Sequence, residues 1–116
     1  MQYVLLIYQS EAEMAAKTEA AMGAMMSEYR AFTQGIVQSG NFKAGDALQR
    51  ASTATSVRVR DGKTIATDGP FAETREQLTG YYLIEAKDLD QAITIAARVP
   101  SAKDGTIEVR PILVYS

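Results

Sequence analysis

A long amphipathic segment between residues 18 and 39 restricts the fold of this chain more than any other feature. Apolar side chains recur there every three or four residues, which places them on one face of a helix. Gly40 then provides a stop, so the pattern predicts a helix over Thr18–Ser39. Ser10 and Glu13 have the spacing of a capping box, and a short separate helix is expected there. The apolar face of the long helix consists of Met22, Met25, Met26, Tyr29, Phe32, Ile36 and Val37.

Four segments have the composition of strands. The apolar run Tyr3–Tyr8 is typical of a central strand that is covered on both faces. Leu78–Ala86 is rich in tyrosine, leucine and isoleucine and also indicates a central strand. Phe42–Leu48 contains a Gly-Asp pair and predicts an irregular strand. The last predicted strand is Ile107–Tyr115, in which Pro111 favours a sheet edge or a bulge.

A β-hairpin is predicted over residues 55–67. Thr55–Arg60 alternates valine with arginine, as a strand with one wet face does. Asp61 and Gly62 follow, and this pair is a strong hairpin signal because both central residues of the turn need positive φ. Lys63–Thr67 continues in an extended pattern.

A second helix is predicted to open at Asp88, with Gln91 three residues on, and to end at Pro100. Its inward stripe is expected to be Leu89, Ala92, Ile93 and Ala96.

These elements predict an α+β fold of the ferredoxin-like kind. Without the inserted hairpin their order is βαββαβ, and the length of 116 residues fits a single domain over residues 1–116. Helices in such a fold cover one face of the sheet, and the other face still carries apolar side chains. A second copy of the chain is the simplest cover for that face, so a homodimer is expected.

The composition excludes several kinds of site and partner. The chain has no cysteine and no histidine, so acid–base chemistry would have to come from Asp, Glu, Lys, Tyr or Arg. A hard-cation site of carboxylates stays open, but nothing resembles a calcium loop, and no metal or cofactor is predicted. A net charge of −2 argues against a nucleic-acid partner. The apolar start is short and lacks a basic lead-in, and no stretch is long enough to span a membrane. A cytoplasmic location without a membrane partner is therefore expected.

The most distinctive stretch is Asp68–Glu76, which reads DGPFAETRE. It resembles the signature of the YCII-related proteins, specifically their DGPF-domain branch. The likeness extends over most of the chain, because Tyr3–Tyr8, the hairpin, Gly80–Ile84 and Glu108–Pro111 also look like their family counterparts.

This resemblance implies a dimeric α/β-barrel assembly of ferredoxin-like subunits, with a cleft near the motif. It implies little about a reaction. Some family members are encoded beside, or fused to, extracytoplasmic-function sigma factors, and other relatives carry a His–Asp pair that is proposed to be catalytic. This chain has no histidine, so half of that pair is missing.

Asp68 is the candidate catalytic residue, and three roles are open for it. In a tight turn, its carboxylate would accept nearby backbone N–H bonds. In a cleft, burial would raise its pKa and let it move protons near neutral pH. It could also orient a ligand without chemistry. Phe71 is expected to anchor the loop into the core, and the loop residues expected to contact a small-molecule ligand are Gly69, Pro70, Phe71, Glu73 and Thr74.

Charged residues outside Asp68 are weaker candidates. Arg58, Arg60 and Arg110 would bind an anionic ligand if their strands were neighbours, and otherwise they are ordinary charges at a sheet edge. Glu73 and Glu76 could act as a pair of catalytic carboxylates, but two solvated glutamates on a loop would have the same sequence pattern.

Two sets of aromatic and methionine side chains also have two interpretations each. Tyr29, Tyr81 and Tyr82 would either line a pocket or pack in the core. The methionines of the long helix would either form a soft binding surface or fill gaps in the core.

Three functions follow as hypotheses. The first is an enzyme of lyase or isomerase type, with Asp68 as general acid or base and an arginine or tyrosine holding an anionic intermediate. The second is a binding or regulatory module without turnover, linked to transcription through a sigma factor. The third is a purely structural dimer with a vestigial site.

Overall fold

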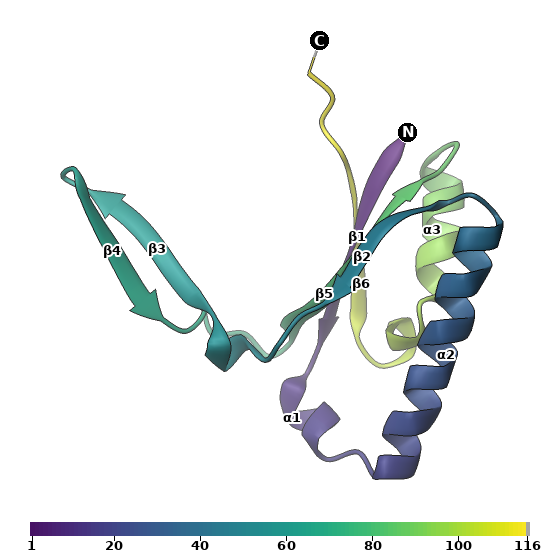
Figure 1. Ribbon diagram of the computed structural model, residues 1–116, viewed down its shortest axis with the longest axis horizontal. Coiled ribbons are helices and arrows are strands. Elements are labelled where there is room, and N and C mark those ends of the chain that lie inside the picture. Colours follow the sequence, from purple (N-terminus) through teal and green to yellow (C-terminus); the bar gives the residue numbers. More distant parts are fainter. Residues whose placement is uncertain (116) are drawn as a thin grey trace.

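The computed structural model describes residues 1–115 as a mixed α+β fold with two antiparallel sheets and three α-helices (Figure 1). The strands are β1 (Gln2–Gln9), β2 (Phe42–Ala47), β3 (Thr55–Arg60), β4 (Lys63–Asp68), β5 (Gln77–Glu85) and β6 (Thr106–Pro111). The helices are α1 (Glu11–Ala15), α2 (Glu19–Gln38) and α3 (Leu89–Arg98), with short 3₁₀ turns η1 (Ala51–Thr53) and η2 (Pro100–Lys103).

Local capping explains where the first two helices begin. The Ser10 hydroxyl accepts a hydrogen bond from the Glu13 backbone N–H at 3.2 Å, which caps α1. The Thr18 hydroxyl accepts one from the Ala21 N–H at 3.1 Å, which caps α2. Each bond satisfies one of the N–H groups that the first turn of a helix leaves free. The short and the long predicted helices are both confirmed.

The main sheet has the strand order β2-β5-β1-β6, and every pairing in it is antiparallel. The apolar strands β1 and β5 are central, as predicted, and β2 and β6 form the edges. The last strand ends at Pro111, which lies on an edge strand as expected, but the predicted extension to Tyr115 is wrong. Pro111 is the last residue of β6, and the Ile112 N–H still donates to the Gln2 carbonyl at 3.0 Å beyond it.

Helices α2 and α3 lie on the same face of the main sheet and enclose the core between them and the sheet (Figure 1). Leu5 on β1, Ile84 on β5 and Ile36 on α2 are each fully buried there. The inward stripe predicted for α3 needs correction. Ala92 and Ala96 are buried, but Leu89 and Ile93 are 49% and 50% exposed, and Ile95 takes the inward position instead.

The opposite side of the main sheet, here called the helix-free face, is also apolar. Side chains alternate between the two faces along a strand. Since Tyr3, Leu5 and Ile7 point to the core, the intervening residues of β1 point away from the helices, and β5 alternates in the same way. The central residues of the helix-free face are Val4, Leu6, Tyr8, Tyr81 and Leu83, all half-buried.

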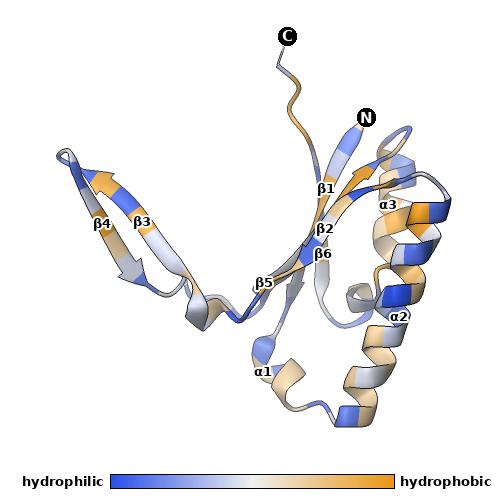
Figure 2. Ribbon diagram, in the orientation of Figure 1, coloured by the Kyte–Doolittle hydropathy of each residue, from blue (hydrophilic) through white to orange (hydrophobic). Residues whose placement is uncertain are grey.

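The hairpin of β3 and β4, here called the arm, forms its own two-stranded sheet and projects away from the main sheet (Figures 1 and 2). Its turn has the predicted positive φ, 52° at Asp61 and 71° at Gly62. The projection makes the radius of gyration 16.2 Å, against about 13 Å for a compact domain of this length. The predicted hairpin is confirmed, and it packs little against the rest of the chain.

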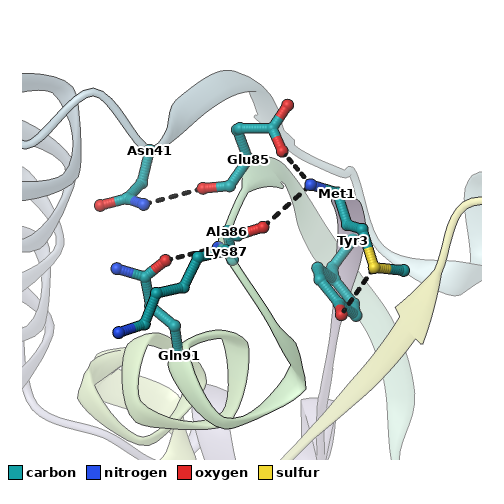
Figure 3. A network of polar contacts seen from close by, with 7 residues as sticks. All are labelled: Met1, Tyr3, Asn41, Glu85, Ala86, Lys87 and Gln91. Atoms are coloured by element: carbon teal, nitrogen blue, oxygen red, sulfur yellow. Dashed lines mark hydrogen bonds and ion pairs between the residues drawn. The ribbon is translucent and has the colours of Figure 1, made fainter.

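A network of polar contacts ties the start of β1 to the end of β5 (Figure 3). The Met1 amine contacts the Glu85 carboxylate and donates to the Ala86 carbonyl at 3.0 Å. The Asn41 amide donates to the Glu85 carbonyl at 2.8 Å, which joins the end of α2 to the same strand. None of the helices in residues 1–115 is both long and apolar enough to cross a membrane.

Candidate functional site

A pocket of about 560 Å³ lies between α1, α2 and the adjoining parts of β1, β2 and β5. Its walls are mostly apolar, and four of the chain's five methionines line it. Methionine is flexible and polarisable, so such a wall adapts to ligands of different outline. The apolar side chains of the wall are Ile7, Met14, Ala15, Met22, Met25, Met26, Phe42, Ala47 and Leu48.

Tyr82 on β5 is the best fixed aromatic side chain of the pocket. Its ring meets Phe32 edge-on at 5.3 Å between centroids and Phe42 at 6.3 Å. A Cβ atom at Gly45 would come within 2.7 Å of the Tyr82 ring, so the glycine makes room for it. Glycine at position 45 of β2 therefore leaves the space that the Tyr82 ring occupies.

The most buried polar side chains that line the pocket are uncharged. The hydroxyls of Thr33 and Tyr82 lie 2.7 Å apart and share a hydrogen bond. Gln9 is 6% exposed, and its amide oxygen accepts a hydrogen bond from the Thr79 hydroxyl at 2.8 Å. These groups can donate and accept hydrogen bonds, but at neutral pH they carry no charge.

Tyr29 also lines the pocket, and its hydroxyl is hydrogen-bonded to the Ser101 hydroxyl. Burial raises the pKa of Tyr29 above its ordinary value of 10.0, and the bond to Ser101 offsets part of this effect. The phenol is therefore neutral over the whole physiological range.

Two charged side chains, those of Glu11 and Arg50, line the pocket where it is more exposed. The Glu11 carboxylate accepts the Ala51 N–H at 2.8 Å. Asp46 on β2 also borders the pocket, but its carboxylate accepts the Tyr81 hydroxyl at 2.8 Å on the helix-free face, and this hydrogen bond raises the pKa of Tyr81. Within residues 1–115, the Arg50 guanidinium forms no ion pair and donates no hydrogen bond. Both carboxylates are thus occupied by protein donors, and only the arginine is not.

The distinctive motif lies outside this pocket. Asp68 is the exposed last residue of β4, and its carboxylate makes no hydrogen bond to another described residue. Gly69 has a φ of 95°, and its carbonyl accepts the Ser56 hydroxyl at 2.8 Å, so the turn is closed by the glycine backbone. The expectation that Phe71 anchors the loop in the core is wrong, because this side chain is 83% exposed. Pro70, Glu73 and Thr74 are exposed as well.

The predicted ligand-binding residues therefore divide into separate groups. Tyr29 and Tyr82 come together in the pocket. Arg58 lies on the arm and Arg110 on β6, and since β3 pairs with β4 and β6 with β1, the chain does not bring these two arginines together.

Several of the pocket residues were not identified from the sequence, and for others two interpretations were left open. Two interpretations were open for the methionines of α2, and Met22, Met25 and Met26 all line the pocket, although Met26 is also 51% exposed. Their spacing is the same for a core stripe and for a pocket wall. Gln9 and Thr33 carried no signal, because single polar residues in an apolar strand or helix are common.

The chemistry of the described residues gives no metal-binding cluster, since no group of three or more acidic side chains within residues 1–115 converges suitably.

Comparison with known proteins places the chain among related sequences over its whole length. The family model of the YCII-related domain matches residues 1–116. An uncharacterized protein of Rhizobium meliloti (strain 1021) is 35% identical over 117 residues, which cover 99% of this chain and 94% of that protein.

Proposed function

The chain belongs to the YCII-related domain family, and from that premise we propose that it is a homodimer that binds a small organic molecule in the methionine- and tyrosine-lined pocket under α2. The observation that carries the proposal is the pocket itself. Its volume of about 560 Å³ falls within the range of about 300–1,000 Å³ that is typical of small-molecule sites. Its composition fits as well, because apolar walls with a few convergent polar groups are the usual make-up of such sites.

Binding without turnover is favoured over acid–base catalysis by the same residues. The most buried polar groups of the pocket are Gln9 and Tyr82, and Thr33 shares a hydrogen bond with Tyr82. None of them is a carboxylate or amine that would serve as a general base near pH 7. Asp68 remains the second candidate for chemistry, as the acid or base of a lyase or isomerase reaction. Its exposed carboxylate would need a second copy of the chain to cover it before it could act in a site shielded from water.

The pocket proposal is tested with Nile red, an uncharged dye whose fluorescence rises in apolar surroundings. Met25→Glu places a carboxylate in the pocket wall, and we expect dye affinity to fall by about tenfold or more, because the charge loses water when the dye binds. Ala24→Glu adds the same charge one residue away on the same helix, outside the pocket, and should keep the wild-type affinity. Equal affinity of both variants would show that the dye binds elsewhere.

We further propose that the main sheet is a ferredoxin-like subunit of a dimeric α/β barrel. The element order without the arm is βαββαβ, and the central positions of β1 and β5 agree with that arrangement. A second copy seated on the helix-free face would cover Leu6 and Leu83 with the same residues of its partner. This assembly has a sheet in the middle and helices outside, so both layers bury their apolar sides.

The arm supports a contact between copies. Val57, Val59 and Ile65 are 62%, 60% and 46% exposed, and an isolated two-stranded hairpin is only marginally stable in water. The net charges of the arm and of the rest of the chain are opposite in sign. The arm holds three of the chain's 12 basic residues and two of its 14 acidic ones, so it carries +1 while the rest carries −3.

Hydrogen exchange measures the arm contact directly. We expect the amides of residues 55–68 to exchange at least about tenfold more slowly at protein concentrations where the dimer predominates than after dilution, because packing on a second copy suppresses local opening. The exposed α1 amides provide the internal reference. Concentration-independent exchange of the arm would contradict its contact with a second copy.

A further inference from the structure

We infer that the pocket selects a flat, uncharged aromatic molecule with a hydroxyl or carbonyl group at one end. This inference rests on the proposed binding function and names the ligand class for that pocket. Three features carry it: the neutral interior, the opposite charges of Glu11 and Arg50 at the exposed end, and a hydroxyl pair with hydrogen-bonding capacity to spare.

The interior disfavours a charged ligand. Gln9 and Tyr82 are 6% and 8% exposed, and together with Thr33 they offer only neutral donors and acceptors. A carboxylate or ammonium group of a ligand would lose its water there without meeting an opposite charge. The part of the ligand that enters the pocket is therefore uncharged.

The exposed end does not reverse this preference. The Glu11 carboxylate accepts the Ala51 N–H at 2.8 Å, so it is held in place beside the opening. The Asp46 carboxylate is turned away to the Tyr81 hydroxyl on the helix-free face. Among the described residues that line the pocket, Arg50 is the one cation, and its side chain is exposed to solvent. An anionic ligand would approach one carboxylate and one screened guanidinium, whose charges cancel and give no net attraction.

The walls favour a ring over a flexible chain. The Tyr82 ring is held between Phe32 and Phe42 at interplanar angles of 71° and 74°, so it presents a fixed aromatic surface. Thioether groups of methionine make favourable contacts with aromatic rings, and four methionines surround the space. An aromatic ligand would gain these contacts and lose little conformational freedom on binding.

The pair of Thr33 and Tyr82 hydroxyls provides the polar end. The two groups hold two protons, and the 2.7 Å bond between them uses one. Neither hydroxyl has another hydrogen bond recorded within residues 1–115, so the pair can donate one bond and accept others. A ligand hydroxyl or carbonyl matches this capacity.

Three matched probes test the ligand class: 2-naphthol, 2-naphthoate and naphthalene share two fused rings and differ in the polar group. The chain has no tryptophan, so naphthyl fluorescence can be excited beyond tyrosine absorption. At pH 7 we expect 2-naphthol to bind at least about tenfold more tightly than 2-naphthoate, and also more tightly than naphthalene. Tighter or equal binding of 2-naphthoate would overturn the inference while leaving the pocket proposal intact.

Two variants test whether the Thr33 hydroxyl contacts the polar group of the ligand. Thr33→Val should lower the affinity for 2-naphthol by about tenfold and leave that for naphthalene unchanged, because only the hydroxyl contact is lost. Thr94→Val on α3 removes a hydroxyl that donates to the Asp90 carbonyl away from the pocket, and it should change neither affinity. An equal loss for both probes in Thr33→Val would overturn the assigned contact. Failure of all three naphthyl probes and of Nile red to bind wild-type protein would instead refute the binding function itself.

Discussion

Replacing Leu6 by lysine is expected to convert the dimer into a folded monomer. Leu6 lies in the middle of the helix-free face, where it pairs with Tyr81 on β5 and Glu108 on β6. In a two-fold symmetric interface the substitution occurs twice, so two ammonium groups would be buried close together. We expect the dissociation constant to rise by about 100-fold or more, which corresponds to about 3 kcal/mol. Sedimentation velocity over a range of concentrations measures the change.

The chain itself should tolerate this substitution. Leu6 is half-buried in the isolated chain, and the Glu108 carboxylate opposite it provides a partner for the new charge. The circular dichroism spectrum should therefore remain that of the folded protein. Ile93→Lys places the same charge on the outer side of α3, where the side chain is 50% exposed, and it should leave the dimer intact. A wild-type monomer at micromolar concentration, or a Leu6→Lys dimer of unchanged affinity, would each contradict the proposed interface.

Features of the fold that depend on a few neighbouring residues were predictable. The Asp61-Gly62 turn and the Thr18 cap are examples, because positive φ and a free helix N–H are local requirements. The inward face of α3 was not predictable. A helical face that contains Ala92 and Ala96 can include either Ile93 or Ile95. Packing against the sheet chooses Ile95, and no local pattern contains that choice.

The pocket was harder to predict than the elements around it. Its lining comes from α1, α2 and three strands, so it exists only after residues as distant as Ile7 and Tyr82 meet across the sheet. The motif at Asp68 drew attention through its likeness to a family signature, yet within one chain it lies at the base of an exposed arm. Methionines spaced along α2 looked like core residues because the helical period does not tell which part of a face is covered.

Gly105→Ala is expected to cause the largest loss of stability among single-methyl additions to this chain. Gly105 precedes β6, and its N–H donates to the Ser101 carbonyl at 2.7 Å. A Cβ atom there would lie far inside van der Waals contact with the Tyr8 carbonyl oxygen and 3.1 Å from that of Ser101. Both are backbone atoms, and the Tyr8 carbonyl belongs to a central strand, so neither can move as the end of a side chain does.

The expected cost is about 3 kcal/mol in the free energy of unfolding, at the upper end for overpacking, and about 12 °C in Tm for a domain of this size. Gly23→Ala is the matched control, because it adds the same methyl group on α2 where nothing lies within 4 Å of it. That change should raise stability by about 1 kcal/mol, since alanine favours the helix over glycine. Thermal and urea unfolding of both variants measure the two effects, which should have opposite signs. Equal stability of Gly105→Ala and the wild type would mean that the connection into β6 is looser than its backbone contacts indicate.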